Sequence, residues 1–405
     1  ENDVKIKNPN EYRATGRIRP DDETVKMICE EIRRAKRPLI HAGGGVLRSG
    51  ASEELLELAE LMNIPVTTSI SGRGSIPEDH RLALIPQSYG AINAQSEADL
   101  VIVLGSKLGD LDFFGTPPTW GDLDKQRLSG EQIGMNRPVT IGAVGDIKAT
   151  LRSIIERLKA ESAMPEEREY IAIYKDLEKQ WTGQFEEYMT SDAVPMHPLR
   201  VIAEVRSFYP RDSIAVIDGG NTTVWSHYAN RVFLPNTFLS SSAGDSGYIG
   251  TGIAYAIAAK HARPRNKVYC ITGDGSFGYN VSELETARRL GIHFTCVVLN
   301  DDSWGMIKSG QTLYYDKRYV GVDFGSMDYA EIAKGMGCFG ETVRTPSELK
   351  EGLRRAEKSN LPAVLDVKIE KGLTPPDFQT LAEIWLEGCE PPPKEIKQET
   401  TQIIQ

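Results

Sequence analysis

The sequence predicts an α/β protein with two domains, each a three-layer arrangement of helices on both faces of a parallel sheet, joined by a helical linker. Short apolar runs alternate with helix-like segments at the spacing of strand–helix units. Several runs end on glycine or on an acid, which is typical of parallel strands at a ligand-binding sheet edge. The 405 residues are also too many for one ordinary core. We expect a linker over 1–20, a first domain over 21–160, a helical linker over 161–196, a second domain over 197–372 and a tail over 373–405.

The composition argues against some classes of partner. A net charge of -10 disfavours nucleic acid or an anionic membrane surface as the main partner. The apolar runs are short and interrupted by Gly or Pro, so no transmembrane helix is predicted. The five cysteines are scattered and form no CxxC pair, which is typical of reduced core residues in a cytoplasmic protein.

The first domain follows the strand–helix rhythm except at one place. An acidic cap near Asp21 predicts a helix through about Ala35. The further predicted elements are a strand and glycine turn over 38–46, a helix over 52–62, strands over 64–68 and 98–104, and a closing helix over 146–160. Between 120 and 137 a strand is due, yet almost no apolar run is present. Either that strand is very short, or several residues are absent from this part of the sequence.

The helical linker and the second domain come next. Residues 161–196 carry Glu, Lys, Tyr and Trp at helical spacing, which predicts a charged helix over the surface with no chemistry. The second domain begins near His197. Its predicted elements are helices to Phe208 and over 281–290, 328–336 and 347–359, strands over 213–217, 267–273, 293–299 and 363–367, and a turn over 218–221. In the tail we expect a docked helix over 378–386 and disorder after Pro391.

Two strands of the second domain end on acids. One runs into Gly273-Asp274-Gly275, and the next into Asn300-Asp301. Parallel strands bring their carboxyl ends to one edge of a sheet, so Asp274 and Asp301 are expected to lie close together. The glycines let the backbone approach a phosphate, and the acids can hold the metal that a phosphate needs. A helix cap for Asp274 and a turn residue for Asp301 are the structural alternatives.

These two elements resemble the cofactor motif of the thiamine-diphosphate-dependent enzymes, whose usual form is Gly-Asp-Gly and, farther along, Asn-Asn. The resemblance implies Mg²⁺ bound by Asp274, Asp301 and the main-chain carbonyl of Ser303. Asp301 stands where the family usually has asparagine, and both residues are hard oxygen ligands that suit Mg²⁺.

The resemblance extends to the contacts with the organic cofactor. The glycine-rich segment 246–252 is similar to the part of the family that grips the thiamine ring system. It implies that Ile249 wedges under the bent cofactor and that Gly247 offers its carbonyl to the aminopyrimidine. Residues implied around the diphosphate are Asn221, Thr222, Thr223, Gly273, Gly275, Ser276 and Phe277. Plain core packing for Ile249 and an ordinary helix cap for Ser276 stay open as alternatives.

Among subfamilies, the sequence looks closest to the acetolactate synthase large subunit. That likeness implies Mg²⁺- and thiamine-diphosphate-dependent decarboxylation and carboligation of a 2-oxo acid, pyruvate to acetolactate. Gly310 stands where biosynthetic acetolactate synthases carry a tryptophan, so a 2-oxo acid decarboxylase or a 2-hydroxyacyl-CoA lyase of the same family stays open. A nucleotide-binding module that works by association is the non-enzyme alternative.

The resemblance also implies parts beyond these residues. Family members use a glutamate from an N-terminal domain, usually a partner subunit's, opposite the aminopyrimidine. The chain begins with Glu1, and we expect that domain to be missing, so no catalytic residue is assigned here. An active site between subunits implies a homodimer or homotetramer.

Two further features of the sequence stay open. The first domain resembles the central domain that holds FAD in acetolactate synthases, where Gly43–Gly45 and Gly105 would approach a nucleotide or simply form tight turns. The six histidines show no metal-ligand spacing, and only His227, just after the diphosphate loop, merits attention.

Overall fold

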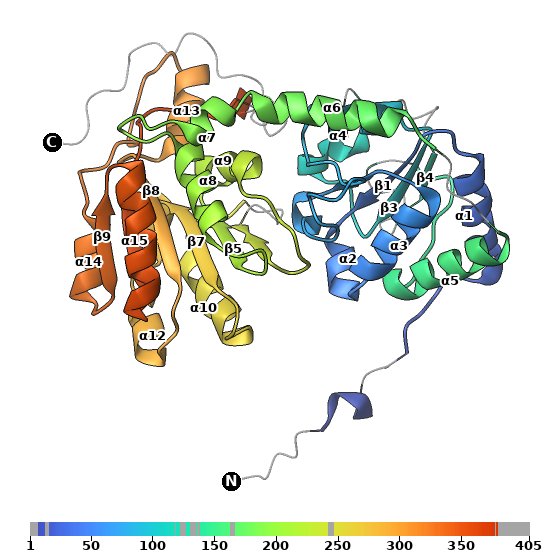
Figure 1. The fold of residues 1–405 in the computed structure, drawn as a ribbon, viewed down its shortest axis with the longest axis horizontal. Helices are drawn as coiled ribbons and strands as arrows, with labels where there is room; N and C mark the ends of the chain where they lie inside the picture. The colour runs from blue at the N-terminus through green and yellow to red at the C-terminus, as the bar shows by residue number, and fades with distance from the viewer. Residues whose placement is uncertain are drawn as a thin grey trace, which may run out of the picture.

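The computed structural model describes residues 7–12, 16–117, 119–121, 127–129, 136, 138–162, 167–241, 247–376 and 378–379. Within them lie two separate parallel sheets, each with helices on both faces (Figure 1). The strand orders are β2-β1-β3-β4 in the first sheet and β6-β5-β7-β8-β10-β9 in the second. Every strand pairing in these sheets is parallel. The predicted α/β class with two three-layer sheets is therefore confirmed.

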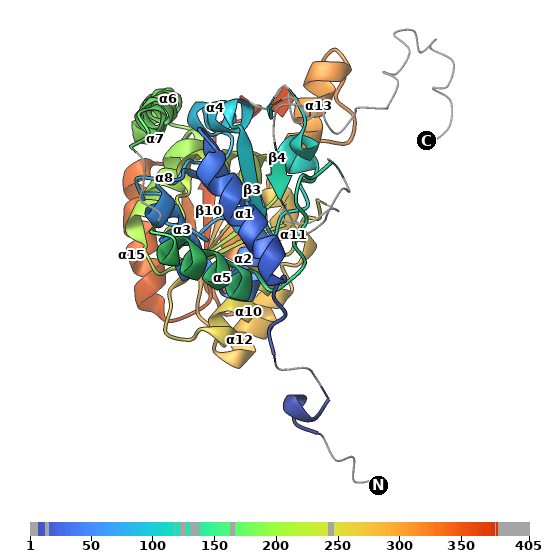
Figure 2. The ribbon, with the colours of Figure 1, turned by 90° about the vertical axis from the view of Figure 1, so that its right-hand side faces the viewer.

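The first sheet separates two apolar clusters, one on each face. Ile40 and Ile102 face a cluster formed with α1, α2, α3 and α5. Leu39 and Val101 face a cluster formed with α4 and with the linker helix α6 (Tyr170–Gly183). This alternation follows from the two-residue side-chain period of a strand. In Figure 2, α1 and α5 lie together over the strands. The elements are α1 (Asp22–Arg34), β1 (Pro38–Ala42), α2 (Gly44–Ser49), α3 (Ser52–Met62), β2 (Val66–Thr68), α4 (Tyr89–Glu97), β3 (Leu100–Leu104), β4 (Arg127–Ser129) and α5 (Ile147–Ala160).

Two elements of the first domain bear on the sequence predictions. The irregular region around 120–137 contains β4, whose three described residues pair with β3. A short strand is thus present there, and its flanks 122–126 and 130–135 lie outside the described residues. Helix α4 was not predicted, because its buried face consists of small residues rather than a large apolar stripe. A Cβ at Gly90 would lie 2.2 Å from the carbonyl oxygen of Tyr174, so the small residue lets α6 approach closely.

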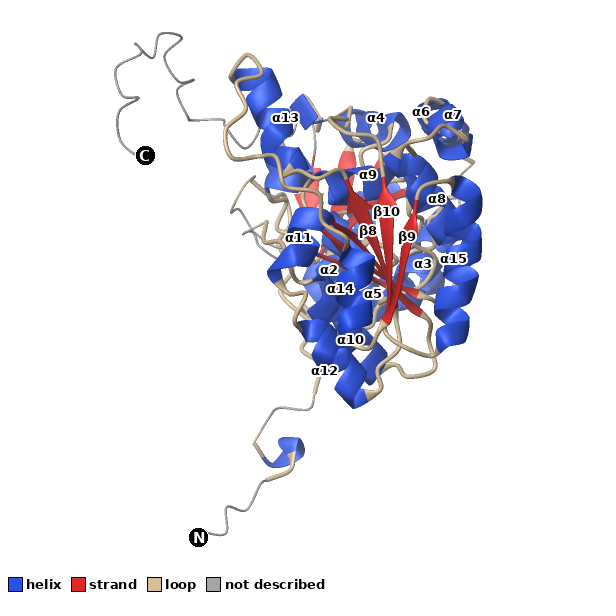
Figure 3. Ribbon diagram, turned by 90° about the vertical axis from the view of Figure 1, so that its left-hand side faces the viewer, coloured by secondary structure: helices blue, strands red, loops and turns tan. Residues whose placement is uncertain are grey.

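The second sheet follows the same layered plan. Ile217, Ile271 and Leu365 face α8, α9 and α15, whereas Val216 and Val298 face α10, α12 and α14. Figure 3 shows α14 and α15 on opposite faces of β8, β9 and β10. The elements are α8 (Pro198–Phe208), β5 (Ile214–Asp218), α9 (Asn221–Ala229), β6 (Phe238–Ser240), α10 (Gly252–Ala262), β7 (Val268–Gly273), α11 (Asp274–Tyr279), α12 (Glu283–Leu290), β8 (Thr295–Asn300), α13 (Gly305–Tyr314), α14 (Tyr329–Gly335), β9 (Phe339–Val343), α15 (Pro346–Ser359) and β10 (Ala363–Lys368).

The linker is more than a surface helix, which corrects the sequence prediction. It forms α6 (Tyr170–Gly183) and α7 (Glu186–Thr190), and α6 spans the space between the two sheets (Figure 1). Tyr174 packs into the core of the first domain, while Trp181 and Phe185 pack into that of the second. The buried carboxylate of Glu178 accepts a hydrogen bond from the backbone N–H of Ile85 at 2.6 Å. Other charged residues of the linker, such as Asp176 and Lys179, are exposed. The linker therefore ties the domains together through its buried face.

The cysteines and the tail were also subjects of the sequence predictions. Cys29, Cys270, Cys296 and Cys338 are buried free thiols, as expected for core cysteines, and Cys389 lies outside the described residues. The predicted tail helix and the disorder after Pro391 also lie outside them, apart from Phe378 and Gln379. None of the helices within the described ranges has the length and apolar character needed to cross a membrane.

A buried ion pair fastens the two domains to each other. Arg73 and Glu78 make two charge-assisted hydrogen bonds of 2.6 and 2.9 Å, and their side chains are almost inaccessible to solvent. Arg73 also donates to the carbonyl of Asn230 at 2.7 Å. Glu78 accepts from the backbone N–H of Val232 at 3.0 Å. Because Asn230 and Val232 belong to the second domain, this pair sets how the domains meet.

We predict that Glu78→Ala lowers the free energy of the first urea unfolding transition by about 3–5 kcal/mol, because it leaves the Arg73 guanidinium buried without its counter-ion. Asp79→Ala is the matched control, since its ion pair with Arg211 joins the same domains at 2.6 Å but both side chains are about half exposed. Its loss should cost about 1 kcal/mol or less. Equal losses for the two variants would contradict this account of the interface.

Candidate functional site

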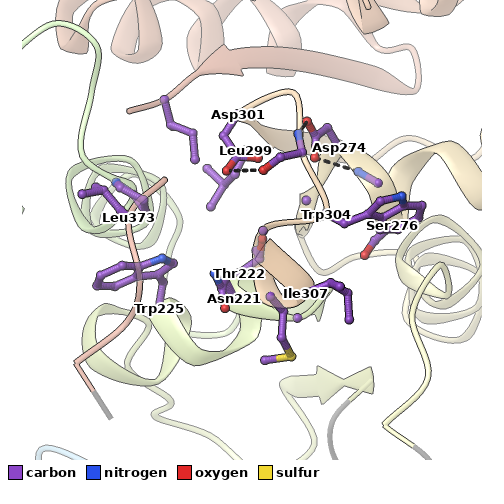
Figure 4. A pocket seen from close by; sticks show the side chains of 18 of the residues that line it. Asn221, Thr222, Trp225, Asp274, Ser276, Leu299, Asp301, Trp304, Ile307 and Leu373 are labelled. Carbon is purple, nitrogen blue, oxygen red and sulfur yellow. Dashed lines mark hydrogen bonds between the residues drawn. The ribbon is translucent and has the colours of Figure 1, made fainter. Parts of the chain in front are cut away.

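A cavity of about 240 Å³ opens at the carboxyl edge of the second sheet (Figure 4). It lies where β5, β7 and β8 end and α9, α11 and α13 begin, the edge at which open α/β sheets bind ligands. The lining residues that the sequence had singled out are Asn221, Thr222, Gly247, Ile249, Gly273, Asp274, Gly275, Ser276, Asp301 and Ser303. The fold therefore brings together in one cavity residues that are widely separated in the chain.

Asp274 and Asp301 lie at one end of this cavity. Asp274 is only 2% exposed, and its carboxylate accepts from the backbone N–H groups of Gly275 at 2.8 Å and Ser303 at 3.3 Å. The hydroxyl of Ser303 donates to Asp301 at 2.9 Å. Burial, followed by the like charge of Asp301, raises the pKa of Asp274 to about 7. Burial also raises the pKa of Asp301, against the opposing effect of the Ser303 hydroxyl.

This pair of acids has the chemistry of a partial site for a hard cation. Two neighbouring carboxylates, one buried and one half-buried, raise each other's free energy when both are ionised, and a cation between them would lower that cost. Mg²⁺ commonly takes one or two carboxylates and completes its octahedron with water and phosphate oxygens. In the described part of the chain no three His, Cys, Asp or Glu side chains form a metal-binding group. The arrangement thus fits a cation held jointly with a phosphate better than a closed protein cage.

Backbone close approach shapes the wall beside the acids. A Cβ at Gly275 would lie 2.6 Å from the indole ring of Trp304, and one at Gly220 would lie 2.6 Å from Met306. Asn221 begins α9 and donates to the hydroxyl of Ser309 at 3.1 Å, which leaves its amide oxygen buried without a hydrogen bond within the described structure. The helix N-terminal N–H groups of α9 and α11 supply the partial positive charge that a phosphate needs.

Asp218 is a structural part of the site that the sequence analysis did not single out beyond a turn. It ends β5 and is buried, and its carboxylate accepts from the backbone N–H groups of Gly250 and Gly252, each at 3.0 Å. Burial raises the pKa of this carboxyl. By gripping these two N–H groups, Asp218 holds the segment that carries Gly247 and Ile249 against the sheet. The signal was present, because β5 also ends on an acid.

The remaining wall of the cavity is mainly apolar, with Glu370 as its charged residue. Trp225 and Leu373 lie at a side of the cavity away from the acids, and Ile307 projects from α13 (Figure 4). Leu299, Met306 and Ile369 also line this wall. Such a surface accepts an organic group and keeps water away from it.

Two residues that the resemblance implies as cofactor contacts, Thr223 and Phe277, do not line the cavity. The hydroxyl of Thr223 donates to the carbonyl of Gly219 at 2.5 Å within its own turn. The ring of Phe277 is 1% exposed and packs edge-on against Tyr329 at 5.3 Å between centroids. Both side chains support the site from behind, because helical geometry turns them toward the sheet.

Backbone packing explains the glycines of the first domain, and burial describes the surroundings of His227. A Cβ at Gly43 would lie 2.3 Å from the carbonyl oxygen of Gly105, so close backbone packing by itself requires these glycines. Both ring nitrogens of His227 are buried, without a hydrogen bond within the described residues. Burial, followed by Arg73, lowers the pKa of His227 to about 3. His227 does not line the cavity.

Comparisons with known proteins agree with this geometry. Residues 218–367 match the family described as thiamine pyrophosphate enzyme, C-terminal TPP binding domain, and residues 25–154 match thiamine pyrophosphate enzyme, central domain. A probable acetolactate synthase large subunit of Methanococcus aeolicus is 33% identical over 365 residues, 85% of this chain and 60% of the relative. An acetolactate synthase large subunit of Mycobacterium tuberculosis is 33% identical over 381 residues, 90% of this chain and 65% of the relative. The chain thus spans about 60% of the length of the first of these relatives.

One residue beside the cavity makes stability depend on pH. His197 caps α8 by accepting the N–H of Leu199 on Nδ1 at 3.1 Å, and it packs edge-on against Trp225. Burial lowers the pKa of His197 to about 4. Because the unfolded chain takes up the proton first, the stabilisation is complete above about pH 6.5 and is lost as the pH falls toward 4.

We predict that His197→Asn, which keeps a capping side chain but does not titrate, flattens the loss of stability between about pH 6.5 and 4 by about 2 kcal/mol, after allowance for partial burial. The measurement is urea unfolding at a series of pH values. His261→Asn, at an exposed position on α10, is the control and should leave the profile unchanged. A wild-type-like profile in His197→Asn would contradict the assignment.

Proposed function

We propose that the cavity of this chain binds thiamine diphosphate through Mg²⁺ for acetolactate synthase-like chemistry. The premise is that the chain belongs to the thiamine pyrophosphate enzymes and has their central domain and their C-terminal TPP-binding domain. The reaction would be decarboxylation of a 2-oxo acid, pyruvate, followed by carboligation to acetolactate. The observation that carries the proposal is the pair of neighbouring acids at the carboxyl edge of the sheet, the buried Asp274 and the half-buried Asp301. Two adjacent acids in an otherwise largely apolar cavity call for a cation and for the anion that it bridges.

We propose one set of residues for binding the metal and another for binding the diphosphate. Asp274, Asp301 and the main-chain carbonyl of Ser303 would hold Mg²⁺, and the cation would offset the mutual repulsion of the acids. The residues proposed around the diphosphate are Asn221, Thr222, Gly273, Gly275 and Ser276. Gly247 and Ile249 are proposed to meet the thiamine rings, supported by the grip of Asp218 on this segment.

The protein contributes position and exclusion of water. When bound, thiamine diphosphate supplies a nucleophilic carbon and an electron sink for the loss of CO₂ from a 2-oxo acid. The apolar wall around Trp225, Leu299 and Leu373 would desolvate the carboxylate of the 2-oxo acid, which favours the loss of charge as CO₂ leaves. No glutamate of this chain is assigned a proton-transfer role, and an activating glutamate from an N-terminal domain is part of the proposal.

A related 2-oxo acid decarboxylase or 2-hydroxyacyl-CoA lyase is the second candidate. Gly310 favours it, because this glycine stands where acetolactate synthases carry a tryptophan. A Cβ placed at Gly310 meets no atom within 4 Å, so this position of α13 leaves open space. The relatives are called acetolactate synthases in their printed names, and this supports the first candidate.

The proposal also covers the oligomeric state, the cellular location and the binding of FAD. Large apolar side chains are exposed on and after α13, with Ile307 at 58% and Val320 at 78%, which supports association into a homodimer or homotetramer. The buried free thiols support a cytoplasmic location. FAD in the first domain also stays a proposal, because backbone packing already accounts for the glycines at the ends of its strands.

The cofactor proposal is tested by thermal unfolding with Mg²⁺ and thiamine diphosphate. At a free cofactor concentration about a hundredfold above Kd, the free energy of unfolding should rise by about 2.7 kcal/mol, which is measured as a raised Tm. Asp274→Asn should lose most of this shift, because it removes a charged metal ligand. Glu285→Gln, which changes an exposed acid paired with Arg289 on α12, should keep it. No shift in the wild-type chain would overturn the proposal.

The choice of reaction is tested with the whole protein and a panel of 2-oxo acids. We expect CO₂ release from pyruvate together with acetolactate as the carbon product. An aldehyde without ligation would favour the decarboxylase, and cleavage of a 2-hydroxyacyl-CoA with no turnover of pyruvate would favour the lyase. Binding of thiamine diphosphate with no turnover of any of these substrates would favour the association module.

A further inference from the structure

We propose that Asp366, on the last strand, is a positioning residue for the divalent cation and that it acts through the side chain of Asn300. This inference rests on the proposed function, because it concerns the geometry of the Mg²⁺ ligands. Asp366 does not line the cavity. Asp366 would orient the metal ligands through the side chain of Asn300 and the backbone turn over 301–303.

Asp366 is a fully buried acid whose hydrogen bonds lead toward the site. It is 0% exposed on β10, the strand that pairs with β8. Its Oδ1 accepts from the amide Nδ2 of Asn300 at 2.8 Å. Its Oδ2 accepts from the backbone N–H of Tyr329 at 3.1 Å and from Lys368 at 3.0 Å. A buried carboxylate is tolerated here because three donors surround it.

Asn300 passes this restraint to the metal-binding turn. Its amide oxygen accepts from the backbone N–H of Asp302 at 3.1 Å. The amide is thus held at both ends, by Asp366 on the nitrogen and by the N–H of Asp302 on the oxygen. A rotation that exchanged nitrogen and oxygen would put donor against donor and acceptor against acceptor, so Asp366 selects one orientation of this side chain.

The turn that Asn300 holds is the one that presents the proposed metal ligands. Asp302 has a φ of 55°, a left-handed conformation that is unfavourable for most residues and is stabilised here by the Asn300 side chain. Asp301 and Ser303 flank Asp302 directly. The direction of the Asp301 carboxylate and of the Ser303 carbonyl therefore depends on this bend. Lys371 adds an outer restraint at 2.7 Å from the Asp302 carboxylate.

A purely structural role for Asp366 would involve the same bonds but a different consequence. Asp366 also anchors the first residue of α14 and pairs with Lys368. Its removal could then lower stability without any effect on the cation. The two roles differ in whether Mg²⁺ affinity follows the Asn300–Asp366 bond, and this can be measured without turnover.

The test is a reciprocal swap of the two side chains. Asn300→Asp places two carboxylates opposite each other. Asp366→Asn leaves a single oxygen for the donors of Asn300, Tyr329 and Lys368, so its NH2 group must face one of them. The double variant N300D/D366N restores one acceptor and one donor across the pair and keeps an oxygen for the N–H of Asp302. The measurement is a calorimetric titration of the full chain with Mg²⁺ at saturating thiamine diphosphate.

We expect each single variant to weaken Mg²⁺ binding about 10- to 100-fold, the range found for residues that orient metal ligands. The double variant should return to within about threefold of the wild-type Kd, which a sum of independent losses would not do. Asp328→Asn, at the cap of α14, removes the same charge nearby without touching Asn300 and should leave the Kd unchanged. Lys368→Met keeps the Asn300–Asp366 bond and should lower stability while the Kd stays within about threefold.

The outcomes separate this inference from the function on which it rests. A wild-type chain that binds no Mg²⁺ with thiamine diphosphate overturns both. Wild-type binding with an unchanged Kd in the single variants, or with no recovery in the double variant, overturns the positioning role alone. If the single variants do not fold, the Kd values of the double variant and of Lys368→Met decide the question, and a weakening of more than tenfold in either overturns it.

Discussion

The approach of two carboxylates, Asp274 and Asp301, is the constraint on which the rest of the site depends. β7 and β8 pair in parallel, with Gly273 opposite Leu299, so the residues that follow must emerge side by side at one edge. Burial then makes their negative charges costly, and the pKa of Asp274 rises to about 7 as a result. The surrounding N–H groups lower the free energy of the ionised carboxylates, and the proposed cation would lower it further.

The supporting structure keeps this edge in place from three directions. Asp218 holds the segment after β6 against the sheet through the N–H groups of Gly250 and Gly252. Asp366 holds the turn after β8 through Asn300. Farther away, Arg73 and Glu78 fix the second domain to the first. In each case a buried acid accepts from donors on a neighbouring element, and the cost of its burial is offset by several hydrogen bonds.

The sequence was most informative where local pattern and burial agree. The long amphipathic helices and the buried strands, such as 52–62 and 268–273, were predicted close to their observed bounds. The short helices α9 and α13 were missed, because they follow turns and lack a clear apolar stripe. The edge strand β9 was missed because only part of it is buried. The family resemblance implies Thr223 and Phe277 as cofactor contacts, and their side chains do not line the cavity.

By itself the sequence determined the α/β class, the acids at two strand ends and, through those motifs, the family. These properties are local, since a strand and the residue that follows it are contiguous in the chain. Only the tertiary structure decided that Asp218, Trp225 and Leu373 share or support one cavity, and that Asp366 contacts Asn300. Such contacts join residues far apart in sequence, and strand order and packing, which no local pattern specifies, bring them together.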